Sequence, residues 1–182
     1  MNRLPLHHDL YLIGHDQAGR PRVHQASLAL GLAGAALLDL LLAGRAAPAD
    51  PRAAIKRAVA DGVYDRARED LLDSGVLVQV SKRRMGVLPY TRYELADIAS
   101  IVRASSGVRS AVEGWKPPDA RCAGLCGLVA VLRLEAELYL DQPANRLVAR
   151  LREIATAAGS PVAELVEIVD TLVAEAAVAV YR

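Results

Sequence analysis

One apolar stretch, residues 27–45, constrains this fold more than any other part of the chain. From Leu28 to Leu38 the chain has an unbroken apolar run of 11 residues, and Asp39 is the first charge after it. A helix that is apolar on nearly every side must be buried in a protein core or in lipid. A membrane span needs ~20 apolar residues, whereas a run of about 10–14 is typical of a core helix. The sequence therefore predicts a buried central helix over residues 27–43, with Leu32, Ala36 and Leu40 close to fully buried.

Two glycines and one aspartate within this helix predict specific contacts with neighbouring parts of the chain. Gly31 and Gly34 have no Cβ, and they predict that a neighbouring helix or strand approaches closely. Asp39 is unusual in so apolar a helix, because a buried carboxylate needs a partner. We expect an Arg side chain or backbone N–H groups to supply that partner.

The remaining patterns predict a mainly α fold, a compact helical bundle around the central apolar helix, with small β-hairpins. A first hairpin is expected within residues 4–24. A second hairpin is expected to join strands at 76–80 and 87–90 through a basic turn at 81–86. No repeat or low-complexity linker interrupts the chain, so we expect a single domain over residues 1–182. Further helices are expected over residues 52–60, 64–73, 94–105, 119–140, 144–158 and 161–181.

Capping residues mark several of these helix ends. Asp50 is expected to be the N-cap of a helix whose first position is Pro51. Gly75 is placed to cap the end of the helix before it. The last helix carries apolar residues at the spacing of one stripe, so it should dock on the bundle.

The charge balance excludes a general affinity for polyanions. The formal net charge is only +1, so anion binding must come from a local cluster of basic residues. The chain has 19 Arg and 3 Lys, a mixture typical of a genome rich in G and C and hence of a bacterial source. The first residues lack the pattern of a cleaved leader, so we expect a cytoplasmic protein that can associate with a membrane.

Catalytic and metal-binding motifs are not found in the sequence. No G-x-S-x-G, H-E-x-x-H or P-loop pattern occurs, so we expect neither enzymatic activity nor a cofactor. His7, His8 and His15 lack a clear ligand spacing, and we predict no metal site. Cys122 and Cys126 lie four residues apart on one face of an expected helix, which favours two buried thiols.

The basic turn of the second hairpin is the best site candidate. Lys82, Arg83 and Arg84 stand beside Met85 there, and positive charge next to apolar residues suits an anionic membrane surface. Each basic residue near anionic lipid is worth about 1 kcal/mol, and inserting Met85 would add ~1–2 kcal/mol. One such hairpin binds weakly, so several copies or a headgroup pocket would be required. The same residues also fit a solvated hairpin tip or a contact with a protein or a second copy of this chain.

A set of motifs in order resembles the Golgi phosphoprotein 3-like family. The chain reads L-x-L-x-x-D-L-Y-L-I near its start and then G-L-A-G-A-A-L-L-D-L-L-L-A-G-R. The resemblance implies a peripheral membrane protein that binds phosphoinositides such as phosphatidylinositol 4-phosphate, and the family includes bacterial members. Downstream segments that resemble the family are residues 71–77, 82–93, 119–140 and 161–181.

The headgroup residues that this family implies are not matched. Where well-known members have a Trp and three Arg, this chain has His24, Ala33, Asp61 and Tyr64. We therefore carry over no headgroup residue and expect no strong preference for phosphatidylinositol 4-phosphate. Five basic residues offer a different anion site by their proximity in sequence: Arg20, Arg22, Lys56, Arg57 and Arg66.

Two other functions remain as alternatives to lipid binding. The first is a protein–protein interaction module that uses the basic hairpin. The second is a winged-helix nucleic-acid binder, whose recognition helix would be residues 64–73. That helix has a net charge of −2, a poor match for phosphates, so we expect no nucleic-acid partner.

Overall fold

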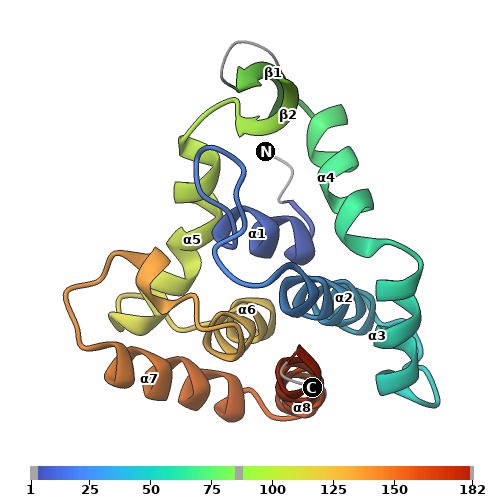
Figure 1. Cartoon of the computed structure of the whole chain (residues 1–182). Coiled ribbons are helices and arrows are strands. Elements are labelled where there is room, and N and C mark those ends of the chain that lie inside the picture. Colours follow the sequence, from blue (N-terminus) through green and yellow to red (C-terminus); the bar gives the residue numbers. More distant parts are fainter. Residues whose placement is uncertain (1–3, 85–87, 181–182) are drawn as a thin grey trace.

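The computed structural model describes residues 4–84 and 88–180, and it is mainly α with one β-hairpin (Figure 1). Helices enclose a common core, and the hairpin projects from one end of the helical body. The elements are α1 Leu6–Ile13, α2 Gln25–Leu42, α3 Pro51–Ala60, α4 Val63–Asp73, β1 Leu77–Arg84, β2 Leu88–Leu95, α5 Ala99–Val112, α6 Ala120–Val131, the 3-10 helix η1 Glu135–Leu138, α7 Ala144–Ala157 and α8 Val162–Val180.

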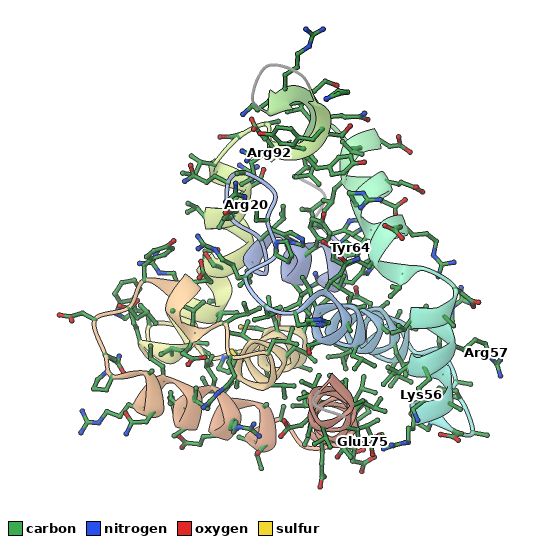
Figure 2. All side chains as sticks on the ribbon, in the orientation of Figure 1. Arg20, Lys56, Arg57, Tyr64, Arg92 and Glu175 are labelled. Atoms are coloured by element: carbon green, nitrogen blue, oxygen red, sulfur yellow. The ribbon has the colours of Figure 1, made fainter. Side chains whose placement is uncertain are left out.

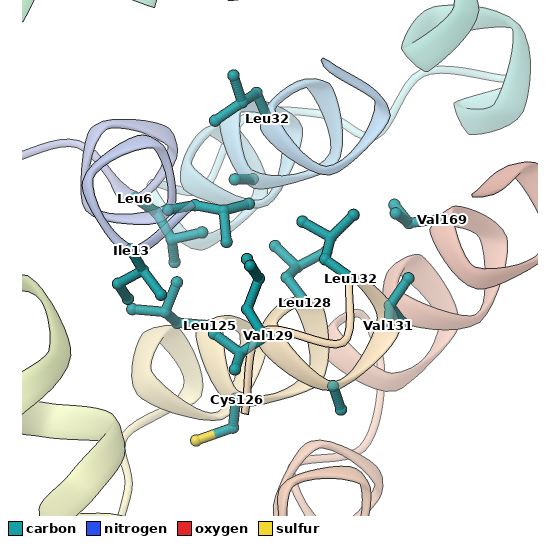
Figure 3. Packing of buried hydrophobic residues seen from close by; sticks show 14 of the residues in the cluster. Leu6, Ile13, Leu32, Leu125, Cys126, Leu128, Val129, Val131, Leu132 and Val169 are labelled. Carbon is teal, nitrogen blue, oxygen red and sulfur yellow. The ribbon is translucent and has the colours of Figure 1, made fainter. Parts of the chain in front are cut away.

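The core lies between α1, α2, α6 and α8 (Figure 3). Every residue from Cys122 to Val131 of α6 is buried, so this helix shares the centre of the bundle with α2. Leu128 of α6 and Val169 of α8 both lie next to Gly34 of α2, so three helices meet at this point of the core. The expected stripe of α8 is confirmed, because its apolar residues from Val162 to Leu172 pack into this cluster.

Close approach of helices depends on glycine at the predicted positions. A Cβ at Gly31 would lie 2.7 Å from Cδ1 of Leu132, and a Cβ at Gly34 would collide with Val169 of α8. The predicted close contacts at both glycines are therefore confirmed. A third such contact occurs at Gly124 of α6, where a Cβ would collide with Leu38 of α2.

The burial of α2 is less complete than its sequence suggests. Leu32 is fully buried as expected, but Ala36 is only half-buried and Leu40 is 49% exposed. Both lie about 200° around the helix from the buried Leu38, so they face away from the core. By length and composition, α2 is the one helix among the described residues that could cross a membrane. It packs instead against α1, α6 and α8, and its residues from Leu28 to Ala35 are all buried.

The segment before α2 forms a single β-bridge rather than the first of two hairpins. Residues 6–13 are entirely helical, and between them and α2 an isolated bridge joins His15 to Pro21. Gly14 accepts a hydrogen bond from the backbone of Arg22 across the same turn. His24 then begins α2 as its N-cap, accepting from the Ala26 N–H, so the expected returning strand is wrong.

Two helix boundaries also differ from the prediction. The helix expected at 94–105 instead begins at Ala99, because β2 continues to Leu95, which pairs with Leu77. The helix expected at 119–140 ends at Val131. Arg133 has a φ of 58°, and this left-handed backbone conformation ends α6. Glycine usually occupies such a position, so the sequence does not indicate the helix end.

Asp39 has the partners that its burial requires. Its carboxylate accepts from the guanidinium of Arg121 and from the backbone N–H of Leu6. Nη2 of Arg121 also donates to Oδ2 of Asp9 at 3.0 Å, so one Arg of α6 ties α1 to α2. Burial alone would raise the pKa of the Asp39 carboxyl, but His7, the Leu6 N–H and the charge of Arg121 lower it. The predicted partner of Asp39 is thus confirmed.

Candidate functional site

The basic residues of the hairpin lie in strand β1 and not in its turn. In the antiparallel register Lys82 pairs with Tyr90, and Arg83 pairs with Pro89. Arg84 ends β1 opposite Leu88. The predicted basic turn at 81–86 is therefore wrong for these three residues, and the strands are longer than predicted. Met85 falls outside the described residues.

The pleat of β1 separates Lys82 from Arg83. Successive side chains in a strand point to opposite faces of the sheet, so these two neighbours cannot form one flat patch. Arg83 lies on the same face as Tyr93, whose ring is 4.5 Å from the guanidinium carbon of Arg68. This cation–π contact holds the hairpin against α4. Lys82 lies on the other face, together with Arg92.

Two of the basic side chains of the hairpin, Lys82 and Arg92, interact with other residues of the hairpin. Lys82 forms an ion pair with Glu94, so part of its charge is compensated. The Arg92 guanidinium lies 5.1 Å from the centre of the Tyr90 ring. Residues 77–95 nevertheless contain four basic side chains and one acidic side chain, a net charge of +3 in a chain of net charge +1.

A further cation comes from the loop before α2. Gly19 packs directly on β2, where a Cβ would collide with the carbonyl oxygen of Tyr93. The next residue, Arg20, is exposed and lies with Arg92 at the hairpin end of the molecule (Figure 2). We call Arg20, Lys82, Arg83 and Arg92 the basic hairpin surface. Sequence reasoning missed Arg20 as a part of it, because only the fold brings that loop to β2.

The positions of the family's headgroup residues do not form a cationic site in this chain. Ala33 is 2% exposed within the core, and Tyr64 is 8% exposed. Asp61 ends α3, and His24 caps α2. None of these four residues is an Arg or a Lys, so they do not reproduce the cluster of Arg residues that the resemblance implies.

The alternative anion site suggested by sequence proximity is also dispersed. Arg20 lies at the hairpin, whereas Lys56 and Arg57 lie on α3 at the other end of the molecule (Figure 2). The Nε atom of Arg22 lies 3.3 Å from Oε2 of Glu137, so Arg22 already forms an ion pair. The five residues therefore do not converge on one ligand.

A buried polar cluster joins α1 to α4. The His15 ring stacks on Tyr11 at a centroid distance of 3.9 Å. Its Nδ1 lies 2.7 Å from the Tyr11 carbonyl oxygen, and its Nε2 lies 2.7 Å from the Tyr64 hydroxyl. A carbonyl can only accept, so Nδ1 carries the proton and Nε2 accepts from Tyr64. Burial lowers the pKa of His15 to about 4, and the ring is neutral at pH 7.

This neutral histidine predicts a loss of stability in acid. Between about pH 6.5 and pH 4 the unfolded chain protonates His15 and the folded protein does not. The contribution of His15 to the free energy of unfolding should therefore fall by about 3 kcal/mol as the pH decreases across this window, and this contribution should not change further below it. Urea unfolding at several pH values measures the slope. His15→Gln should flatten it, whereas an unchanged slope in the variant would assign the acid sensitivity to other groups.

Two pockets lie away from the hairpin. One has a volume of about 400 Å³ and is lined by Arg103, Lys116 and Arg121 together with Asp9 and Asp119, so its charges have both signs. The other has a volume of about 520 Å³ and is bordered by the exposed apolar side chains of Ile98, Val102 and Tyr139. Neither has the concentrated positive charge of the hairpin.

Comparison with known proteins agrees with the motifs in the sequence. A family model described as Golgi phosphoprotein 3 (GPP34) matches residues 6–57 and 45–172. These segments together span α1 to most of α8. A search of curated proteins finds no match.

Proposed function

The chain belongs to the Golgi phosphoprotein 3 family, and on this premise we propose that it is a peripheral membrane protein that binds anionic phospholipid headgroups without catalysing a reaction. The observation that carries the proposal is the basic hairpin surface. It concentrates positive charge on a projecting element of a nearly neutral chain. The protein is then cytoplasmic and associates reversibly with the membrane.

The faces of the hairpin favour an end-on approach to the membrane. Because Lys82 and Arg83 point to opposite faces, a sheet lying flat on lipid would present only one of them. An end-on hairpin presents cations from both faces to the headgroups. At about 1 kcal/mol for each basic residue, three such contacts give about 3 kcal/mol, which is weaker than millimolar binding. Several hairpins in one particle would raise this affinity.

The second candidate function is a contact with a protein or with a second copy of this chain. In the described residues β1 and β2 pair only with each other, so each has one edge without a strand partner. Such edges can pair with another strand, and edge Lys and Arg residues oppose that pairing. Nucleic-acid binding has less support, because Arg68 of α4 is engaged by Asp65 and Tyr93.

The test of this function is co-sedimentation of the full chain with vesicles of defined composition. We expect binding to phosphatidylserine vesicles and to phosphatidylinositol 4-phosphate vesicles of matched charge, with affinities within about threefold of each other. Neutral phosphatidylcholine vesicles should not bind. Binding should weaken with salt, because the Debye length falls from ~10 Å at 0.1 M to ~3 Å at 1 M. Tight, salt-resistant binding of one headgroup alone would contradict charge recognition and indicate a stereospecific pocket.

A further inference from the structure

The surface between α1 and α4 holds a cluster of three possible metal ligands. His7 and His8 lie in α1, and Asp70 lies in α4. One donor atom from each residue lies within 4.8 Å of the donor atoms of the other two. Nothing in the sequence spacing predicts this cluster, because Asp70 is distant along the chain and only the packing of α4 on α1 brings it to the histidines.

His8 is the unusual member of the cluster. It is 7% exposed, yet among the described residues neither of its ring nitrogens has a hydrogen-bond partner. A buried polar group without a partner is costly, and such a group usually has a specific explanation. The Nδ1 atom of the adjacent His7 also has no hydrogen-bond partner there and lies 3.9 Å from Oδ2 of Asp39.

The spacing between His8 and Asp70 suits two ligands of one ion better than a hydrogen bond. Nε2 of His8 lies 3.4 Å from Oδ2 of Asp70. Zinc takes nitrogen and oxygen ligands at ~2.0–2.2 Å in tetrahedral geometry, which separates two ligand atoms by about 3.3–3.6 Å. A strong hydrogen bond to a carboxylate would instead be ~2.7–2.9 Å long. The donor atoms of all three residues lie within 4.8 Å of one another, so the distances to His7 must shorten by at most about 1.4 Å to reach that spacing.

From this geometry we propose that His7, His8 and Asp70 bind a divalent transition-metal ion of the zinc type. Two imidazoles and one carboxylate are a ligand set that such ions prefer, whereas calcium and magnesium prefer oxygen ligands alone. The Asp70 side chain is 60% exposed, so the ion can enter from solvent and keep water as its remaining ligand. The bound ion would join α1 to α4. This inference is independent of lipid binding.

Calorimetric titration of the untagged, chelator-treated full chain with Zn²⁺ tests the proposal. We expect one ion per chain, a dissociation constant of about 1 μM or below, and a higher melting temperature with the ion. Asp70→Asn should weaken binding at least about tenfold. Because the Asp70 side chain is exposed, we expect this variant to fold, so weaker zinc binding would not result from unfolding. Circular dichroism verifies that the variant is folded. Glu69→Gln, at the adjacent exposed position, and His24→Gln are matched controls that should bind as the native chain does.

Cobalt substitution identifies the ligands independently. Co²⁺ bound by nitrogen and oxygen should show visible absorption without sulfur-to-cobalt charge transfer, and the absorption should disappear in Asp70→Asn. A sulfur band would place the ion at Cys122 and Cys126 and overturn the proposal. The proposal would also be overturned if fewer than about 0.1 ions bind per chain at a free Zn²⁺ concentration ten times the expected dissociation constant. An unchanged zinc affinity in Asp70→Asn would overturn it as well.

Discussion

Reversing two charges of the basic hairpin surface, Lys82→Glu with Arg83→Glu, is expected to abolish measurable binding to anionic vesicles. The double variant loses two attractive contacts and adds two repulsive ones at about 1 kcal/mol each, which corresponds to a weakening of about a thousandfold. The fold should persist, because neither side chain is part of the buried core. Co-sedimentation measures the binding, and the melting temperature verifies the fold.

Charge reversal on another surface provides the matched control. Lys56→Glu with Arg57→Glu makes the same change in net charge on exposed positions of α3. If this control weakens binding as strongly as the hairpin variant, attraction depends on total charge and the hairpin is not the contact. If the native chain ignores anionic vesicles but the hairpin variant changes its oligomeric state in analytical ultracentrifugation, the hairpin serves a contact between proteins.

The second large effect concerns the fold, at the ion pair between α2 and α6. Arg121→Met should lower the free energy of unfolding by about 3–5 kcal/mol, because it leaves the carboxylate of Asp39 without its cation. The side chains of Arg121 and Asp39 are only 17% and 25% exposed, so water replaces the lost partner poorly. The Arg121 bond to Asp9 is lost as well. Urea unfolding at neutral pH measures the change.

An exposed ion pair on the same molecule gives the comparison for Arg121→Met. Nη1 of Arg152 lies 2.7 Å from Oδ2 of Asp170, but these side chains are 45% and 39% exposed. Arg152→Met should therefore cost at most about 1 kcal/mol. Equal costs for the two substitutions would contradict a special role for the partly buried pair.

The sequence predicts those parts of the fold that depend on local signals. Asp50 accepts from the Ala53 N–H and caps α3, whose first residue is Pro51, as expected. Gly75 has a φ of 71° and ends α4, also as expected. Both interactions lie within a few residues of chain, where the identity of the side chain determines the backbone conformation.

Errors arise where distant contacts override local patterns. The end of α6 depends on a left-handed conformation at Arg133, a residue type that gives no such signal. The pairing of Leu95 with Leu77 extends β2 into a segment with helical character. The exposure of Leu40 depends on which sides of α2 the other helices cover, and the apolar pattern of α2 is too uniform to show it.

The candidate site was only partly accessible to sequence reasoning. The concentration of positive charge near Lys82 is visible in the sequence, but its division between two faces depends on the strand register. Arg20 joins the surface only because Gly19 packs on β2. The ion pair between Lys82 and Glu94 likewise requires the hairpin to be folded.

Site-specific fluorescence tests the proposed membrane contact most directly. Thr91→Cys on β2 and Ala149→Cys on α7 each place one reactive thiol on an exposed position, and native Cys122 and Cys126 are buried. An environment-sensitive dye at position 91 should shift to the blue and be quenched by headgroup-labelled anionic vesicles, whereas the dye at position 149 should not respond. Equal responses at the two positions, or a response at position 149 alone, would contradict binding through the hairpin.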